Sequence, residues 1–237
     1  MISLLVSGVG GSLAKGGIYN MRIQWFGQSC FMIISDSGVT IITDPFGKPL
    51  PYRLPDKQPD IVTVSHDHPD HNNTKALKGN FELVKKPVET EIKGVKIKGI
   101  VTYHDNSGGK KRGQNIVFKL TVDEITICHL GDLGHVLNED QVQAIGDVDI
   151  LLLPVGGRVT IDAAAAAAVK AQLHPTITIP MHYRTKAMGI FGMLFNNVSS
   201  FLDLTADQKI ELSELAVTKE ELEEKSGVIT LSYQQRK

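Results

Sequence analysis

The chain has 237 residues, with hydrophobic side chains at 42% of its positions and charged side chains at 22%. These proportions are typical of a globular protein and exclude a disordered, collagenous or largely membrane-embedded chain. With 25 basic and 26 acidic side chains the net charge is −1, so the chain lacks the overall basic excess typical of nucleic-acid binders, although a local basic patch is left open and no nucleic-acid partner is expected. The length is sufficient for one substantial domain with its own core.

The cysteine content indicates the redox compartment. Only Cys30 and Cys128 are present, which excludes a disulfide scaffold and a four-cysteine zinc module. A reducing compartment, and hence a cytoplasmic protein, is expected. Cys128 falls inside a predicted strand and is expected to be buried and inert.

Residues 1–20 contain a short apolar stretch without a basic start. They are predicted to be an extension outside the core, with an export signal as the weaker alternative, and the domain is predicted to span 21–237. Since no apolar run approaches the ~20 residues that cross a bilayer, no membrane association is expected.

From Met21 onward, short apolar runs separated by turn residues predict paired strands. The runs span residues 21–26, 30–35, 39–44, 61–65, 81–86, 95–103, 115–122 and 125–130. A loop rich in proline and glycine follows the third run. Two later runs, 149–157 and 175–183, lack alternation, which is typical of strands covered on both faces.

Helices are predicted between the later strands. Residues 138–146 begin with Asn138 as a cap, and residues 162–173 begin with Asp162 before a run of alanines. Residues 206–225 predict a charged amphipathic helix or helix pair, and 228–233 a last strand. The alternation of strands and helices predicts an α/β protein with a single domain.

Three of the eight histidines fall within six residues, directly after the strand at 61–65. In an extended chain His66 and His68 share a face and can converge on one cation. Pro69 holds His68 out of the helical region, and Asp70 and His71 then turn away. Two pairs of ligands suit two metal ions roughly 3.5–4 Å apart, whereas a polar loop without metal is the weaker alternative.

Three further candidate ligands each follow the end of an apolar run, namely His104, Asp132 and His182. Loops at one end of the strands of an α/β sheet converge on a common crevice, so these residues are expected to meet the first cluster. Imidazole and carboxylate without thiolate suit Zn²⁺, with Mn²⁺ or Fe²⁺ as alternatives. Two divalent cations would favour a small anionic substrate.

The sequences His66-x-His68-x-Asp70-His71, Gly131-Asp132 and Pro180-Met181-His182-Tyr183 resemble the metallo-β-lactamase superfamily. The segments HLGDLGH, LLLPVGG and IPMHY are most similar to its stand-alone hydrolases related to ascorbate-6-phosphate lactonase and to a large group of uncharacterised metal-dependent hydrolases. The resemblance implies a four-layer αβ/βα sandwich with the metals at one edge of two sheets.

The resemblance also implies a ligand set. One metal would be held by His66, His68 and His104, the other by Asp70, His71 and His182, with Asp132 bridging and Asp44 supporting a ligand. Asp132 stands where the commonest true class B β-lactamases carry cysteine, which argues against antibiotic hydrolysis. His68 stands where flavodiiron proteins carry glutamate, which argues for hydrolysis over redox chemistry.

The leading hypothesis is hydrolysis of an anionic small-molecule ester, lactone or phosphoester by a hydroxide bound to two metals, oriented by Asp70 or Asp132. A phosphodiesterase or nuclease of the same superfamily is the first alternative. A non-catalytic metal-binding or regulatory protein is the second.

Several neighbouring residues are weighed for supporting roles. His135 is a candidate proton donor and His129 a candidate neighbour of the centre, while Arg184 and Lys186 are candidate contacts for an anionic substrate. The basic, glycine-rich loop 106–113 either approaches a phosphate or is a solvated turn. The apolar segment 188–202 is a core helix, a lid or a subunit contact, and the last of these would make the protein a homo-oligomer.

Overall fold

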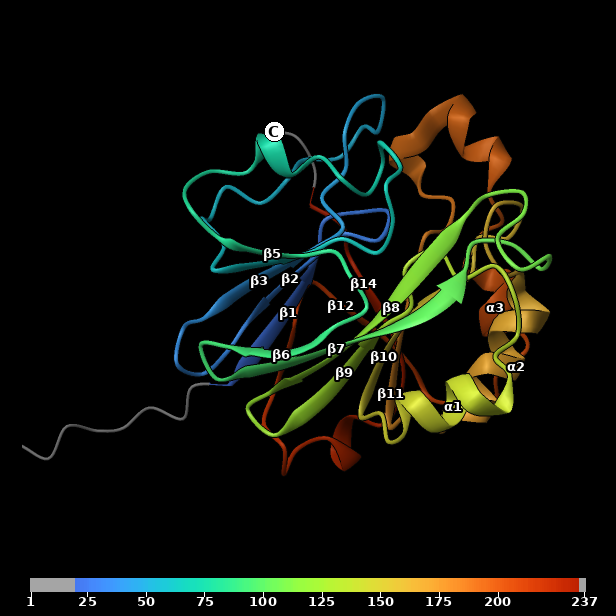
Figure 1. Ribbon diagram of the computed structural model, residues 1–237. Coiled ribbons are helices and arrows are strands. Elements are labelled where there is room, and N and C mark those ends of the chain that lie inside the picture. The colour runs from blue at the N-terminus through green and yellow to red at the C-terminus, as the bar shows by residue number, and fades with distance from the viewer. Residues whose placement is uncertain (1–19, 235–237) are drawn as a thin grey trace, which may run out of the picture.

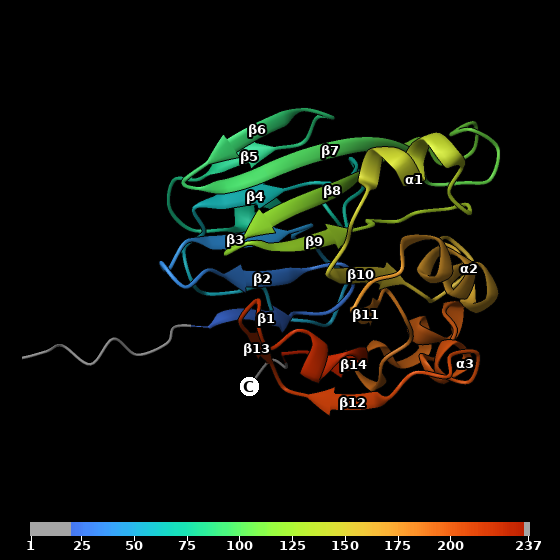
Figure 2. The ribbon, with the colours of Figure 1, turned by 90° about the horizontal axis from the view of Figure 1, so that it is seen from below.

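Two mixed β-sheets pack face to face and enclose the main hydrophobic core (Figures 1 and 2). The structure is a computed structural model and describes residues 20–234, so the predicted N-terminal extension lies, apart from Asn20, outside the described residues. The six-stranded sheet has the order β13-β1-β2-β3-β4-β5, and the eight-stranded sheet has the order β12-β14-β11-β10-β9-β8-β7-β6.

The strand bounds follow most of the predicted apolar runs. The six-stranded sheet contains β1 (Met21–Trp25), β2 (Phe31–Ile34), β3 (Thr40–Thr43), β4 (Ile61–Thr63), β5 (Glu82–Val84) and β13 (Leu215–Val217). The eight-stranded sheet contains β6 (Glu89–Ile92), β7 (Val95–Tyr103), β8 (Gln114–Val122), β9 (Ile125–His129), β10 (Ile150–Pro154), β11 (Ile177–Met181), β12 (Lys209–Leu212) and β14 (Gly227–Leu231). Every residue of β10 and β11 is buried, which confirms the prediction of strands covered on both faces.

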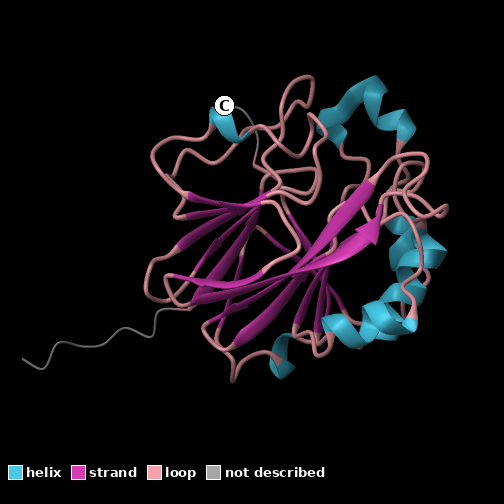
Figure 3. Ribbon diagram, viewed as in Figure 1, coloured by secondary structure: helices cyan, strands magenta, loops and turns pink. Residues whose placement is uncertain are grey.

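The helices lie on the outer side of the eight-stranded sheet (Figure 3). They are α1 (Glu139–Ile145), α2 (Ala163–Leu173) and α3 (Ser199–Leu202). Asn138 caps α1 by accepting a hydrogen bond from the Gln141 amide, and Asp162 caps α2 by accepting one from the Ala165 amide. Both predicted caps are therefore confirmed.

A different kind of layer covers the six-stranded sheet. Phe46 and Tyr52, from the proline-rich loop after β3, join Met32 and Ile42 in a second buried cluster. Short 3₁₀ turns complete the structure at η1 (Thr74–Ala76), η2 (Lys186–Leu194) and η3 (Glu223–Lys225). The predicted α/β sandwich is confirmed, with loop and 3₁₀ turns in the place of an α-helix outside this sheet.

The prediction of a helix at 206–225 is wrong. These residues form β12, β13 and the η3 turn. Leu215 and Val217 are fully buried because β13 pairs antiparallel with β1 at the edge of the six-stranded sheet, while β12 pairs in parallel with β14. Strand pairing thus overrides the helical propensity of the many glutamates and lysines, as tertiary context often does.

The apolar segment 188–202 is anchored at its ends and exposed in its middle. Met188 and Phe201 are buried, whereas Ile190 is 85% exposed and Met193 is 68% exposed. The segment is therefore not a core helix, and the lid and the subunit contact remain as interpretations. None of the helices within residues 20–234 has the length and apolar composition to cross a membrane.

Strand direction determines where the polar residues gather. β3 runs parallel to β4, and β9, β10 and β11 run parallel to one another, so each set ends at one edge of its sheet. β7 and β9 share a direction because both are antiparallel to β8. The segments that follow these strands are therefore brought to a common end of the sandwich.

Candidate metal centre

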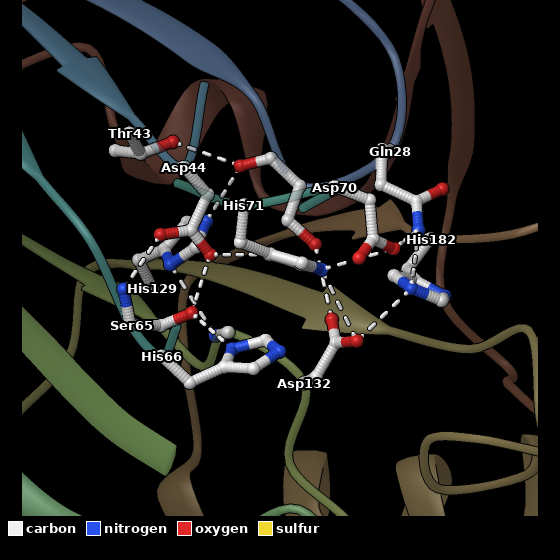
Figure 4. A network of polar contacts seen from close by, with 12 residues as sticks. Gln28, Thr43, Asp44, Ser65, His66, Asp70, His71, His129, Asp132 and His182 are labelled. Carbon is white, nitrogen blue, oxygen red and sulfur yellow. Dashed lines mark hydrogen bonds and ion pairs between the residues drawn. The ribbon is translucent and has the colours of Figure 1, made fainter. Parts of the chain in front are cut away.

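All seven predicted ligands lie in two adjacent groups at this end of the sandwich. Figure 4 shows five of them, His66, Asp70, His71, Asp132 and His182. His66, His68 and His104 form one group, and Asp70, His71, Asp132 and His182 form the other. Within each group the potential ligand atoms lie within 4.8 Å of one another. The fold therefore assembles the predicted residues from four separate segments of the chain.

Asp132 belongs to the second group and also contacts a histidine of the first. Its Oδ2 atom is 3.2 Å from His71 Nε2, 3.3 Å from His104 Nε2 and 3.2 Å from His182 Nε2. The Asp132 backbone amide donates to Asn115 Oδ1 at 2.9 Å, which fixes the position of the loop after β9. A carboxylate in this place can reach a cation in either group.

Asp44 lies outside the two ligand groups and supports two of their histidines by hydrogen bonds. Its Oδ2 atom accepts a hydrogen bond from His71 Nδ1 at 2.8 Å, and its carboxylate also accepts from the backbone amide and hydroxyl of Ser65. The Ser65 hydroxyl lies 2.9 Å from His66 Nδ1. Engaging Nδ1 in both rings leaves Nε2 as the nitrogen that faces the cluster.

The polar atoms of the cluster fit a metal ion better than they fit one another. His66 Nε2 is buried and has no hydrogen-bond partner, and His71 Nε2 faces the carboxylates of Asp132 and Asp70 at 3.2 and 3.5 Å. A buried polar atom without a partner is costly in a folded protein, and a bound cation removes that cost. Neutral imidazole and carboxylate are ligands that Zn²⁺, Mn²⁺ and Fe²⁺ accept.

The ionisation of the cluster favours cation binding. Burial lowers the pKa of His66 to about 3, so its imidazole is neutral near pH 7. Burial opposes the charge on Asp132, but His182 and His71 hold the pKa of that carboxyl well below its ordinary value. Burial also opposes a charge on His71, yet Asp132 and the other carboxylates raise its pKa, which shows that these carboxylates favour positive charge at this place.

Two glycines allow the ligand loops to approach closely. A Cβ atom on Gly156 would overlap the carbonyl oxygen of His182, and a Cβ atom on Gly134 would overlap the backbone between His104 and Asp105. The LLLPVGG and HLGDLGH segments therefore need glycine for packing against the backbones that carry two candidate ligands.

The two further histidines have different environments. His129 is fully buried, and its Nε2 atom donates to the carbonyl oxygen of Ser29 at 2.8 Å beneath the cluster. His135 Nε2 accepts from the Tyr103 backbone amide at 3.2 Å, and its Nδ1 donates to the Val136 carbonyl at 2.8 Å. Both ring nitrogens of His135 thus contact backbone groups and the side chain anchors its loop, while its role as a proton donor stays a prediction.

The basic loop 106–113 folds around a carboxylate. Asp105 accepts hydrogen bonds from the amides of Ser107, Gly109, Lys111 and Arg112 and from the Ser107 hydroxyl. These amides are therefore occupied, and the alternative that the loop cradles a phosphate is not supported. The loop instead orders the chain directly after His104.

The two candidate substrate residues lie beside a groove. Arg184 and Lys186 are exposed and line a groove of about 820 Å³ together with Ile190 and Met193. The neighbouring Phe195 ring packs against His182, with ring centroids 5.2 Å apart. The groove therefore begins where the chain leaves the cluster.

Sequence reasoning missed Gln28, which lies in the turn after β1. Its side chain is buried, and its Nε2 atom is 3.0 Å from Asp70 Oδ2 and 2.6 Å from His182 Nε2 (Figure 4). The signal was present, because Gln28 follows an apolar run just as His104 and Asp132 do. Ser65 and Asn115 were missed too, because a hydrogen bond to a ligand leaves no trace in residue spacing.

Comparison with known proteins identifies the chain's relatives. A family model of the β-lactamase superfamily domain matches residues 22–182. A UPF0173 metal-dependent hydrolase of Thermoplasma acidophilum is 32% identical over 193 residues, covering 70% of this chain and 84% of that protein. A similar hydrolase of Methanopyrus kandleri is 28% identical over 200 residues, covering 70% of this chain and 85% of that protein.

Solved structures agree with this assignment. A protein of Thermotoga maritima, named as a candidate Zn-dependent hydrolase of the metallo-β-lactamase superfamily, is 38% identical with a TM-score of 0.75. The match covers 90% of this chain and all of that chain. An isothiocyanate hydrolase from Delia radicum gut bacteria has a TM-score of 0.63 at 13% identity, which shows a shared fold alone, and covers 91% of this chain and 98% of that one.

Proposed function

Because the chain belongs to the metallo-β-lactamase superfamily and is one of its metal-dependent hydrolases, we propose that it hydrolyses a small anionic ester, lactone or phosphoester at two divalent cations. The observation that carries this proposal is the place of Asp132, with one carboxylate oxygen within 3.3 Å of nitrogens from both histidine groups. A carboxylate shared in this way suits a bridge between two ions.

The ligand assignment follows the two groups. His66, His68 and His104 would hold one ion, and Asp70, His71 and His182 would hold the other, with Asp132 shared. Zn²⁺ is the proposed ion because the donors are imidazole and carboxylate and because the Thermotoga maritima relative is named as Zn-dependent, with Mn²⁺ and Fe²⁺ as alternatives. Bound cations of this kind polarise the scissile oxygen and lower the pKa of water to about 7.

The chain's own residues have distinct tasks in this scheme. Asp70 is partly exposed at the edge of the cluster and is, with Asp132, a carboxylate placed to orient an attacking water. Asp44 lies behind the ligands, where it fixes the orientation of His71 directly and that of His66 through Ser65. This division keeps the ligands rigid while one carboxylate remains open to substrate.

The charge balance supports an anionic substrate. Two divalent cations bring four positive charges, whereas the ligands Asp70 and Asp132 together with a hydroxide would bring three negative ones, so the ligand shell itself retains positive charge. Arg184 and Lys186 add two cations at the nearby groove. A carboxylate or phosphate on the substrate would be attracted by both.

The test combines metal analysis with a substrate panel. We expect about two ions per chain by elemental analysis and turnover confined to one class among lactones, thioesters, phosphate monoesters and phosphodiesters. The Asp132→Ala variant should lose metal and turnover together. The matched control Asp147→Ala removes an exposed carboxylate outside the cluster and should retain both.

The other outcomes separate the alternatives. Turnover by metal-free protein would contradict the proposal. Hydrolysis limited to nucleic-acid phosphodiesters would favour a nuclease of the same superfamily. Bound metal without turnover of any ester class would favour a regulatory metal-binding protein.

A further inference from the structure

Gln28 lies inside the cluster although it is neither histidine nor a carboxylate. Its side chain is 2% exposed, and the end of the side chain contacts Asp70 and His182, two proposed ligands of one ion (Figure 4). The contacts join residues 42 and 154 positions apart in the chain. The amide thus completes the side of the group that faces the turn after β1.

The backbone of this turn is held in place by four hydrogen bonds. The Gln28 carbonyl oxygen accepts from Trp25 Nε1 at 3.0 Å and from the His182 backbone amide at 3.1 Å. The next carbonyl, on Ser29, accepts from Thr43 Oγ1 at 2.9 Å and from His129 Nε2 at 2.8 Å. Gln28 itself has φ of 52°, a left-handed conformation that is uncommon outside glycine. A fixed backbone in a strained conformation aims the side chain at one place, and such strain often occurs at functional sites.

The spacing of the polar atoms matches a shared coordination shell. Donor atoms bound to one ion at about 2.0–2.2 Å lie about 3–3.5 Å apart. Asp132 Oδ2 is 3.2 Å from His71 Nε2 and from His182 Nε2, and Asp70 Oδ2 is 3.5 Å from His71 Nε2. The end of Gln28 is 3.0 Å from Asp70 Oδ2, which falls in the same range, and 2.6 Å from His182 Nε2, which is the closer approach of a direct hydrogen bond.

The amide can present either of two atoms at that place. A half-turn about its terminal bond exchanges Nε2 for Oε1 with little change in shape. With nitrogen inward, Gln28 donates to Asp70 and occupies a lone pair that a cation would use. A cation reverses the preference, because an amide oxygen is a ligand for hard and borderline cations and an amide N–H is not.

We propose that Gln28 Oε1 is a further ligand of the ion held by Asp70, His71, Asp132 and His182. This inference rests on the proposed two-ion centre. It gives that ion one more oxygen donor, whereas the group of His66, His68 and His104 has histidine donors and the shared carboxylate. The two subsites then differ in donor number and in affinity.

The experiment measures metal affinity directly. Metal-free protein is titrated with Zn²⁺ in competition with a chromophoric chelator, for the wild type and for Gln28→Leu and Gln28→Glu. Leucine fills similar space and meets the same backbone conformation but provides no donor, whereas glutamate keeps an oxygen at the same reach. Gln24→Leu, on the preceding strand, is the matched control, and thermal unfolding verifies that each variant is folded.

The proposal predicts a selective effect. Gln28→Leu should weaken the binding of the ion held by Asp70, His71, Asp132 and His182, called here the second ion, by about 10- to 100-fold. The affinity for the ion at the other group, the first ion, should stay within about twofold. Gln28→Glu should bind the second ion at least as tightly as the wild type. Equal affinities in Gln28→Leu and wild type would overturn the inference. A second ion lost equally in Gln28→Glu would also overturn it, because the amide would then act through its N–H. A wild type that binds fewer than two ions would instead overturn the two-ion centre itself, and this inference with it.

Discussion

Asp44 Oδ2 accepts a hydrogen bond from His71 Nδ1 at 2.8 Å, and both side chains are completely shielded from solvent. Asp44 follows a strand of the six-stranded sheet and lies 27 positions before His71. Burial opposes its ionisation, but the hydrogen bond from His71 and nearby histidines lower the pKa of the Asp44 carboxyl. The pair therefore fixes both the orientation and the tautomer of one candidate ligand.

Replacing Asp44 should weaken metal binding without removing a ligand. In Asp44→Asn an amide N–H can face His71 Nδ1 and favour the other tautomer, so Zn²⁺ affinity should fall about 10- to 100-fold. Chelator competition measures the change, with Asp147→Asn as the control. An Asp44→Asn protein with wild-type affinity would show that the hydrogen bond has no role in metal binding.

Replacing Asp105 should release the loop that it organises. Desolvation opposes its charge, but hydrogen bonds from Arg112, Ser107 and Lys111 hold the pKa of the Asp105 carboxyl below its ordinary value. The contribution of a lowered acid pKa is present above about pH 4 and is lost as the pH falls. In Asp105→Ala the basic residues at 110–112 should become sites of rapid trypsin cleavage, whereas the wild type should resist. Equal cleavage rates would contradict a carboxylate-organised loop.

Gly156→Ala should disturb His182. The added Cβ would overlap the His182 carbonyl oxygen, so the backbone must move, at a cost of about 1–3 kcal/mol in unfolding free energy. Urea denaturation measures this loss, and metal titration should show weakened binding of one ion. Gly94→Ala, where a Cβ meets nothing within 4 Å, shows for comparison the cost of a left-handed glycine, a conformation that Gly156 does not have. An unchanged unfolding free energy in Gly156→Ala would show that the close contact at His182 has no energetic effect.

Cys128 should make stability depend on alkaline pH. Burial raises the pKa of its thiol to about 12, well above the ordinary range of a cysteine. The unfolded thiol ionises first, so its contribution is complete below about pH 9 and is lost as the pH rises toward 12. Between about pH 9 and 10.5 the loss is about 2 kcal/mol in unfolding free energy. Urea denaturation of Cys128→Ala should show a shallower decline than the wild type, and parallel curves would contradict this assignment.

Most strands and both helix caps could be predicted because they depend on local patterns. The apolar runs that became β1 to β4 and β7 to β11 alternate with turn residues, and Asn138 and Asp162 stand directly before helix-forming runs. The helix prediction for residues 206–225 was wrong because their structure depends on distant residues. Its glutamates and lysines favour helix locally, but β13 is fixed by pairing with Met21 to Ile23, nearly two hundred residues earlier in the chain.

The sequence by itself determined the chemistry of the candidate site: histidines and aspartates at the ends of apolar strands, and a spacing at 66–71 that resembles one superfamily. Only the tertiary structure decided which residues support that chemistry. It placed Gln28 against Asp70 and His182, Asp44 beneath His71, and both His135 nitrogens on backbone groups. The physical reason is range, because strand patterns arise between neighbours in the chain whereas hydrogen bonds across two packed sheets depend on how those sheets meet.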